Sequence, residues 1–414
     1  MTPFALHALC GKCKNHFDLF SLFEHGMVVC ENIIKVYDSE VHSMNLITVK
    51  PELHRFDSCR EFAEMFQIGE KDFILASKST YLKHFHDLNT GAVVAFKSDY
   101  GPGEPTDLMC EAIMADVEKS GCTRIIAIGG GAVIDIAKAL AVSDGNTMDE
   151  LYAKAPALTR KRGLVIVPTT CGTGSEVTAI SILSRVRLNT KLGLVSPALY
   201  PDSAVLIPEL LEDLPFSVFA TSSLDALIHA MESALSPKAN AVTRMFSYQA
   251  VDMILQGYRA IAEQGPDARI ALLEDFLLAS TYAGIAFGNA GCAAIHALSY
   301  PLGADRHVPH GESNYAILSG VIRKYRQIKT DGELAVLGEK IAAALSCAPA
   351  DAFDALEVLL EKILKRKPLR EYGLTEADLV TYTDSVLANQ TRLLANNFVP
   401  LTREDILDIY QSLY

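Results

Sequence analysis

The sequence predicts two domains: an α/β domain with a parallel, Rossmann-like sheet, followed by an all-helical domain. Two different patterns of hydrophobic residues along the chain predict this division. Up to Pro208, short runs of aliphatic and β-branched residues alternate with segments of helical period. After Pro208, segments of helical period follow one another with few β-branched runs. The chain has 414 residues, of which 50% are hydrophobic, so each domain has enough apolar side chains for its own core.

Each expected strand of the first domain is a short apolar run with turn residues on either side. The strands are expected at residues 72–76, 92–96, 124–128, 164–168 and 204–207. Helical periodicity over 106–119 and 133–142 places helices between them, and such alternation favours parallel pairing. Residues 178–183 and 191–196 are expected to form an additional β-hairpin.

The second domain is predicted from longer segments of helical period. These cover residues 219–234, 241–264, 270–286 and 353–364. Prolines recur between residues 208 and 215, so the boundary is placed there. We therefore expect an extension of uncertain order over 1–43, an α/β domain over 44–208 and a helical domain over 209–414.

Cysteine usage favours reduced thiols. The nine cysteines are odd in number and dispersed along the chain, which is typical of a cytoplasmic protein without disulfides. Within the extension, His7, Cys10, Cys13 and His16 fall at steps of three residues. Zinc modules separate their two ligand pairs by a longer spacer, so no metal is expected there.

Charge and hydropathy exclude two kinds of partner. The formal net charge is −13 and there is no long basic run, which argues against nucleic acid. No apolar run approaches the roughly 18 uncharged residues of a membrane helix, and the first residues lack a secretory signal pattern. We expect a cytoplasmic protein that binds neither nucleic acid nor a membrane.

Four residues of the helical domain suggest a metal site. Asp225 and His229 are spaced i, i+4 in a helix-favouring stretch, so both side chains leave the same face. His296 and His310 follow, and the prolines and glycine around them place His296 at a helix end and His310 in a loop. A single histidine is more often an ordinary core or surface residue, but one carboxylate and three imidazoles suit Fe²⁺ or Zn²⁺. Such an ion can polarise an oxygen of a small substrate.

Two glycine-containing runs suggest a phosphate site in the first domain. The strand at 124–128 leads into Gly129, Gly130 and Gly131 and then a helix, so backbone and helix N-terminus can approach a pyrophosphate. The turn is not the GxGxxG of a standard Rossmann fold. Residues 168–178, PTTCGTGSEVT, supply hydroxyls and further glycines after another strand. On the helix that follows the glycines, Lys138 is expected to face solvent.

The glycine runs and the four-residue set together resemble the iron-containing (group III) alcohol dehydrogenases, from about residue 50 to the C-terminus. The resemblance implies a dehydroquinate synthase-like architecture and a homo-oligomer, with a dimer favoured. It implies NAD and one divalent metal, Fe²⁺ in preference to Zn²⁺, with Asp225, His229, His296 and His310 as the metal ligands. The cofactor-contacting positions that it implies are Gly129, Gly130, Gly131, Asp135, Thr169, Thr170, Thr173, Ser175 and Lys191.

The sequence departs from the family pattern at three places. Tyr300 stands where many members have a histidine proposed in proton transfer, so His307 is an alternative relay. Ser77 stands where many members have an Asp that repels a 2′-phosphate, so NADP is not excluded by charge, although NAD is favoured. Cys171 occupies a position that is usually small, and we expect it to fill space rather than to act as a nucleophile.

Residues 282–291 and 366–373 are similar to family members that interconvert 4-hydroxybutyrate and succinate semialdehyde. A short hydroxy acid of this kind needs a cation or several donors for its carboxylate. The candidates are Arg306, His307, Arg392, Asn396 and Asn397. Alternatives are a dehydrogenase for another short alcohol, a diol or lactaldehyde, and a dehydroquinate synthase-like lyase. The Asp and three His argue against the lyase, and a non-catalytic nucleotide-binding protein would not need the full ligand set.

Overall fold

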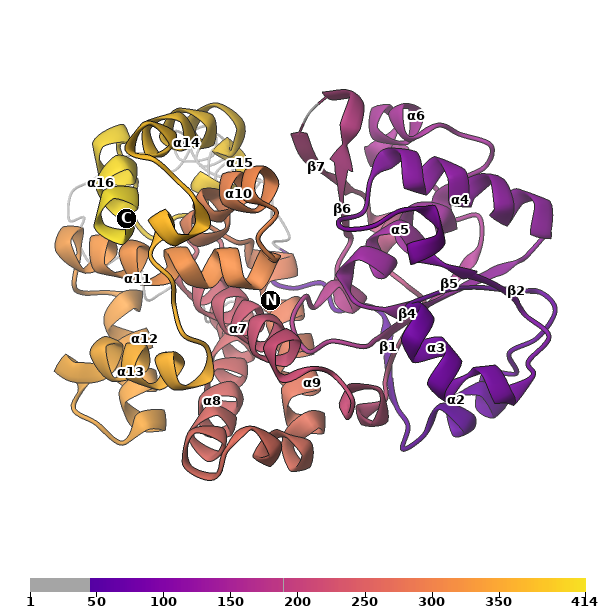
Figure 1. Ribbon diagram of the computed structural model, residues 1–414, viewed down its shortest axis with the longest axis horizontal. Helices are drawn as coiled ribbons and strands as arrows, with labels where there is room; N and C mark the ends of the chain where they lie inside the picture. Colours follow the sequence, from indigo (N-terminus) through magenta and orange to yellow (C-terminus); the bar gives the residue numbers. More distant parts are fainter. Residues whose placement is uncertain (1–44, 189) are drawn as a thin grey trace, which may run out of the picture. The chain divides into compact units, whose positions relative to one another are not determined.

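The computed structural model describes residues 45–188 and 190–414, and from Leu46 onward they form one compact unit (Figure 1). The extension over 1–43, with its His7, Cys10, Cys13 and His16, lies outside the described residues. The first part of the unit is built on a six-stranded sheet, and from α7 (Phe216–Leu235) onward the chain is helical. The predicted fold class is therefore confirmed.

The sheet is parallel throughout, with strand order β1-β8-β5-β4-β2-β3. Its strands are β1 (Glu52–Arg55), β2 (Asp72–Ala76), β3 (Val93–Phe96), β4 (Arg124–Gly129), β5 (Gly163–Pro168) and β8 (Ser203–Leu206). All five predicted strands are present with ends within one residue. β1 was not predicted, because its sequence Glu-Leu-His-Arg is polar and mostly exposed, and it gains its place only by pairing with β8.

The strand order reverses direction between β2 and β4. From β2 the chain moves outward to β3, and from β4 it moves the other way to β5 and β8. In open parallel sheets, the crevice at the carboxyl ends beside such a reversal is where nucleotides bind. The loops that follow β2 and β4 meet at this crevice.

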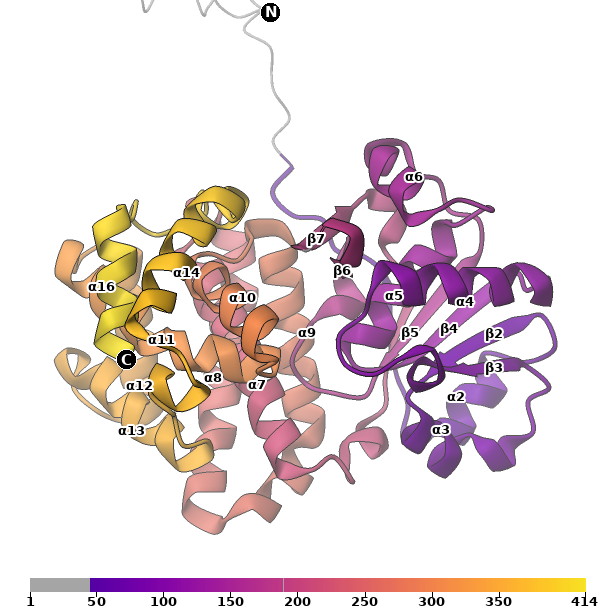
Figure 2. The same ribbon diagram turned by 45° about the horizontal axis from the view of Figure 1, so that its top comes forward.

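Helices cover both faces of the sheet (Figure 2). One face carries α2 (Cys59–Met65) and α3 (Lys78–His84), whose buried aromatic residues join a hydrophobic core that continues into the helical part. The other face carries α4 (Asp107–Ser120) and α5 (Gly131–Val142), with a second core of their own. The remaining elements of this part are α6 (Met148–Ala153) and an antiparallel hairpin of β6 (Ile180–Arg185) and β7 (Thr190–Val195). The predicted helices and hairpin are thus present.

The helical part is centred on three long helices that pack against one another: α7, α8 (Ala241–Gln264) and α9 (Leu273–Ala290). The later helices are α10 (Ala294–Arg306), α11 (His310–Ile328), α12 (Glu333–Leu345), α13 (Ala352–Ile363), α14 (Glu376–Asn389), α15 (Thr391–Leu394) and α16 (Arg403–Leu413). The four predicted helices correspond to α7, α8, α9 and α13. The expectation that no apolar run approaches the length of a membrane helix was wrong. The helical stretch Pro266–Ala290 is long and apolar enough by length and composition, but 56% of its most apolar window is buried against the rest of the fold, as in a core helix.

Candidate metal centre and nucleotide site

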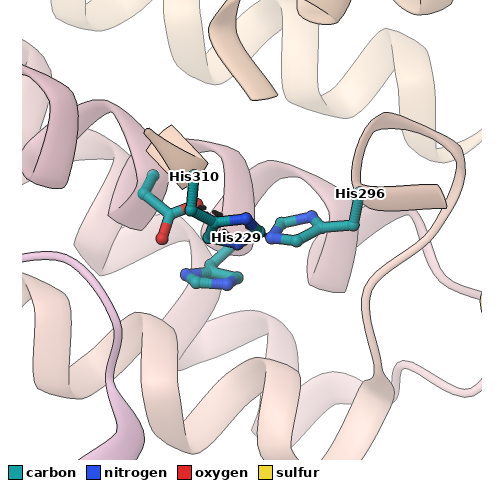
Figure 3. Close-up of side chains that lie close together, drawn as sticks. His229, His296 and His310 are labelled. Carbon is teal, nitrogen blue, oxygen red and sulfur yellow. Dashed lines mark ion pairs between the residues drawn. The ribbon is translucent and has the colours of Figure 1, made fainter. Parts of the chain in front are cut away.

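Three helices bring the four predicted metal ligands together (Figure 3). α7 carries Asp225 and His229 one turn apart, α10 carries His296, and α11 begins at His310. One potential ligand atom from each residue lies within 4.8 Å of the others. His296 Nε2 and His310 Nε2 lie 3.6 and 3.7 Å from Asp225 Oδ1. Ligands held at about 2.1 Å around a tetrahedral ion are about 3.4 Å apart, so these spacings suit a shared ion better than direct hydrogen bonds.

The prediction that His310 lies in a loop was wrong. His310 is the first residue of α11, and Pro309 occupies the position before the helix, where its fixed backbone angle is tolerated. The start of α11 packs closely on α7: a Cβ on Gly311 would lie 2.0 Å from the carbonyl oxygen of Thr221. This contact fixes the depth at which His310 enters the cluster. His296 is the third residue of α10, so its placement at a helix end is confirmed.

Glu232 supports the cluster and was not predicted. It lies on α7 one turn after His229 and is buried. Its Oε2 accepts hydrogen bonds from His296 Nδ1 at 2.6 Å and from the backbone N–H of Ala293 at 3.0 Å, and its Oε1 accepts from the N–H of Ile295 at 2.6 Å. Glu232 therefore caps the N-terminus of α10 and holds the His296 proton on Nδ1. Nε2 of His296 is buried without a hydrogen-bond partner, 3.6 Å from Asp225 Oδ1, so it is the atom of this ring that a bound ion can take.

Asn314 is a second supporting residue that was not predicted. It lies one turn after His310 on α11, and its Nδ2 lies 2.7 Å from Asp225 Oδ1 and 3.2 Å from His310 Nε2. Ser299 of α10 donates in turn to Oδ1 of Asn314. Glu232 and Asn314 both follow a ligand by three or four residues on the same helix. That spacing is the signal in the sequence that could have found them.

His229 connects the metal cluster to the predicted nucleotide loop. Its Nδ1 lies 3.2 Å from the carbonyl oxygen of Gly172, so donation to that oxygen leaves Nε2 free to bind an ion. The ring stacks on Phe287 at 4.2 Å and on His296 at 4.6 Å between centroids. Gly172 itself packs against α7: a Cβ there would lie 2.4 Å from the carbonyl oxygen of Ser222, so only glycine fits without movement.

Burial and mutual charge set the pKa values of the cluster. Burial lowers the pKa of His229 to about 3 and also lowers that of His310. Burial acts in the same direction on His296, but the carboxylates of Glu232 and Asp225 outweigh it and raise its pKa to about 9. Burial would raise the pKa of Asp225, and the surrounding imidazoles instead hold it well below its ordinary value. The donor set is thus one ionised carboxylate with imidazole nitrogens in a buried place.

The chemistry of this donor set fits a divalent metal. A carboxylate and three imidazole nitrogens match the preferences of Fe²⁺ and Zn²⁺. The unpartnered Nε2 of His296 is the clearest sign, because a buried polar atom without a partner costs free energy unless something binds it.

A cavity of about 700 Å³ opens where β2 and β4 end, at the reversal of strand order. It is lined by Ser77, Lys78, Ser79, Leu82, Lys97, Ser98, Gly103, Gly130, Gly131, Ala132 and Val133. The N-terminus of α5 faces it, and free N–H groups there suit phosphate oxygens. Of the predicted cofactor positions, Gly130 and Gly131 line this cavity directly, and the metal cluster lies outside its lining.

The predicted threonines pack against the glycine turn, and neither they nor Ser175 line the cavity. Side chains of Thr170 and Thr173 lie 3.3 and 3.0 Å from where Cβ atoms of Gly130 and Gly131 would be. The N–H of Thr169 donates to the carbonyl of Gly129 at 3.1 Å, so the two runs form one packed unit. Their packing leaves no room for a Cβ at Gly130 or Gly131 without movement of the threonine side chains.

Asp135 and Lys138 form a buried network, and the prediction that Lys138 faces solvent was wrong. Lys138 is fully buried, and its Nζ donates to Ser175 Oγ at 2.7 Å, to Thr178 Oγ1 at 3.0 Å and to the carbonyl of Ile180 at 2.7 Å. Asp135 accepts from Ser175 Oγ at 2.8 Å. The helical pattern of α5 did not show that the strand β6 covers this face. Burial lowers the pKa of Lys138 to about 8 despite the charges of Asp135 and Glu176.

The other predicted residues are placed as follows. Lys191 on β7 lies 3.7 Å from Glu104, and its charge contributes to the lowered pKa of His310. The ring of Tyr300 is 6.0 Å from that of His310, and burial raises the pKa of Tyr300 further above its ordinary value. His307 is exposed and ends α10 in the left-handed conformation, at φ 55°. Cys171 is buried, as expected for a space-filling residue, and all six described cysteines are free.

Comparison with known proteins agrees with this geometry. Residues 54–208 match the profile of the iron-containing alcohol dehydrogenases, and residues 219–414 match the C-terminal profile of the Fe-containing alcohol dehydrogenase family. The chain belongs to the iron-containing alcohol dehydrogenase family and is an oxidoreductase that acts on a small alcohol or aldehyde.

Among curated relatives, 4-hydroxybutyrate dehydrogenase of Clostridium kluyveri is 46% identical over 371 residues, which cover 90% of this chain and 100% of the relative. Long-chain-alcohol dehydrogenase 1 of Geobacillus thermodenitrificans is 35% identical over 70% of this chain and 74% of its own. Among solved structures, sulfoacetaldehyde reductase from Bifidobacterium kashiwanohense in complex with NAD⁺ has a TM-score of 0.76 at 25% identity, covering 90% of this chain and 99% of that one.

Proposed function

We propose that this enzyme transfers hydride between NAD(H) and the pair 4-hydroxybutyrate and succinate semialdehyde, with one divalent metal at Asp225, His229, His296 and His310. Fe²⁺ is favoured and Zn²⁺ is the alternative. The observation that carries the proposal is the convergence of these four ligands from three helices. The 46% identity to 4-hydroxybutyrate dehydrogenase over nine-tenths of the chain supports the choice of substrate.

The residues of the metal site have different proposed roles. A divalent ion held by Asp225, His229, His296 and His310 would supply polarisation of an alcohol or aldehyde oxygen, and bound NAD would supply hydride-transfer chemistry. The four side chains bind the ion, while Glu232 and Asn314 fix the orientation of His296 and Asp225. Phe287 covers one face of His229 and keeps water from that side of the ligand.

For NAD, we propose that Gly129, Gly130 and Gly131 approach the pyrophosphate in the cavity at the end of β4. Thr169, Thr170, Thr173, Ser175 and Asp135 hold this turn and its neighbouring run in place. Lys191 is proposed as a cofactor contact on the hairpin. Its charge contributes to the lowered pKa of His310, one of the proposed metal ligands.

For the substrate carboxylate, Arg392 is a better candidate than Arg306. Arg306 is engaged by Asp378 at 3.1 Å and Asp305 at 3.4 Å. Arg392 lies on α15, which packs against α10, and makes no ion pair with any residue in the described ranges. Its charge lowers the pKa of both Tyr300 and Cys292 against the stronger effect of burial, so it reaches the surroundings of the metal cluster.

For proton transfer, Tyr300 and His307 are proposed in different roles. Burial keeps Tyr300 protonated at neutral pH, so it can donate a hydrogen bond to a substrate oxygen but is a poor base. The exposed His307 can pass a proton to solvent. We further propose that residues 44–208 and 209–414 act as domains, and that the chain is a cytoplasmic homo-oligomer, with a dimer favoured.

The test is NADH oxidation with succinate semialdehyde, using enzyme loaded separately with Fe²⁺ and with Zn²⁺. Butyraldehyde serves as the uncharged control of similar length. A strong preference for succinate semialdehyde supports the proposal. Equal or better turnover of butyraldehyde would keep the dehydrogenase and discard the hydroxy-acid substrate.

A further inference from the structure

A second group of metal-binding side chains lies in the α/β part and shares no residue with the first. It consists of Cys59, the first residue of α2, His84, the last residue of α3, and Glu209 in the 3-10 turn Pro208–Leu211. One potential ligand atom from each lies within 4.8 Å of the others. Both views show α2 and α3 side by side on their face of the sheet (Figures 1 and 2).

The three side chains are far apart in the sequence and meet in a shielded place. The thiol of Cys59 is buried and the His84 side chain is 10% exposed, whereas Glu209 is 35% exposed. His84 Nδ1 lies 3.9 Å from Glu209 Oε1. An ion bound by sulfur at about 2.3 Å and by nitrogen or oxygen at about 2.1 Å holds its ligands about 3.4–3.6 Å apart. Side-chain movement of well under 1 Å would bring His84 and Glu209 to that spacing.

The far side of His84 carries the kind of support that metal-bound histidines have. Its other ring nitrogen, Nε2, lies 3.8 Å from Oδ2 of Asp213, an exposed carboxylate that also pairs with Lys83 Nζ. This distance is longer than a hydrogen bond, so the support requires a small movement of the Asp213 side chain. A carboxylate behind a ligating imidazole fixes the proton on the outer nitrogen and directs the lone pair of the inner one toward the ion. The set therefore contains a thiol, an imidazole and a carboxylate, with the Asp213 carboxylate behind the imidazole.

We propose that Cys59, His84 and Glu209 form a second divalent-metal site, of the kind that takes Zn²⁺, with one position left for water. A thiolate, an imidazole and a carboxylate together favour Zn²⁺ over Mg²⁺ or Ca²⁺, which prefer oxygen ligands. Binding links α2, α3 and the turn that leads into α7. Because burial and the charge of Glu209 raise the pKa of the Cys59 thiol, binding at neutral pH releases the thiol proton.

The structure also gives Glu209 a role that needs no metal. Its Oε2 accepts a hydrogen bond from the backbone N–H of Cys59 at 2.9 Å, at the start of α2. Glu209→Gln retains an acceptor for that N–H and removes the charge that a metal requires. This variant therefore separates capping of α2 from metal binding.

The experiment is a titration of the full-length, metal-free chain with Co²⁺, followed by absorption spectroscopy. The first site offers only nitrogen and oxygen, so a thiolate-to-cobalt charge-transfer band can arise only from a cysteine. We expect a second equivalent of Co²⁺ that produces this band, and we expect Zn²⁺ to displace it. Cys59→Ser should abolish the band, and Asp213→Asn should weaken the second affinity by about 10–100-fold, as outer carboxylates do.

Controls distinguish the other thiols. Cys292→Ser tests the cysteine near Glu232 and His296, and a Cys10→Ser/Cys13→Ser variant tests the CxxC pair of the extension. The Cys292→Ser variant and the Cys10→Ser/Cys13→Ser variant should both keep the charge-transfer band. Cys59→Ser and Glu209→Gln should keep dehydrogenase activity and helical content. A single equivalent without the band, or a band that survives Cys59→Ser, would overturn the proposal whatever the outcome of the substrate tests.

Discussion

Replacing Glu232 by Gln tests whether Glu232 orients the imidazole of His296. The two carboxylate oxygens accept three hydrogen bonds: Oε2 from His296 Nδ1 and the N–H of Ala293, and Oε1 from the N–H of Ile295. An amide has one acceptor oxygen and one NH₂ group. In either orientation the NH₂ group faces a donor, so at least one of the three bonds is lost.

Loss of an outer-shell partner of a ligating histidine costs about 10–100-fold in metal affinity, or about 1.4–2.7 kcal/mol. We expect a decrease of this size for Glu232→Gln, and we expect less loss of overall stability than for Glu232→Ala, which leaves all three buried donors without an acceptor. Metal affinity is measured by competition with a chelator, and stability by chemical unfolding of the metal-free protein.

Glu263→Gln makes the same change at an exposed position of α8 and is the matched control. His296→Ala, which removes a ligand, sets the lower limit of affinity. If Glu232→Gln bound metal as tightly as Glu263→Gln while His296→Ala did not, the orienting role of Glu232 would be refuted.

Three further predictions concern other parts of the site. Lys138→Met should destabilise the fold by about 3–5 kcal/mol, because it removes three buried hydrogen bonds and the positive charge that offsets Asp135. Because the pKa of Lys138 is lowered, the folded chain releases this proton at a lower pH than the unfolded chain does. Between pH 8 and 10 the free energy of unfolding should therefore rise with pH more steeply than that of Lys138→Met. Equal slopes of unfolding free energy against pH for the two proteins would contradict this. Arg392→Ala should raise KM for succinate semialdehyde at least about tenfold and leave butyraldehyde unchanged, with Arg403→Ala as the control; equal effects on both aldehydes would remove Arg392 from the substrate site. Gly172→Ala should cost about 1–3 kcal/mol through its contact with α7 and weaken metal binding. Unchanged metal affinity would show that the hydrogen bond from His229 Nδ1 to the carbonyl of Gly172 does not orient this ligand.

The sequence predicted the sheet well because its buried strands are apolar on both faces. β2, β4 and β5 are almost continuous apolar runs, and their predicted ends agree with the structure within one residue. β1 has no such pattern, since it is an edge strand whose order comes from pairing with β8. α10 was not predicted because Pro301 lies inside it, and a proline usually ends a helix.

The ligand set was predicted from the sequence, whereas the residues that support it were missed. Asp225 and His229 are recognisable from spacing and residue type alone, and all four predicted ligands do meet in the structure. Glu232 and Lys138 gain their meaning from partners distant in the sequence, such as His296 and Thr178. From the sequence alone a lysine on a helix such as α5 is expected to be exposed, and only the structure shows that β6 covers Lys138. Site roles in proton transfer and cofactor contact stay predictions.

The hydrogen bond between Gly172 and His229 has a thermodynamic consequence. One partner belongs to the run that packs on the glycine turn proposed to hold the pyrophosphate, and the other is a proposed metal ligand. If occupancy of the turn alters the position of Gly172, the affinity for metal changes by some factor, and linkage requires metal to change the affinity for the nucleotide by the same factor. The affinity for metal would then have one value with nucleotide bound and another without it, and the same would hold for nucleotide and metal. Each affinity must therefore be measured both with and without the other cofactor.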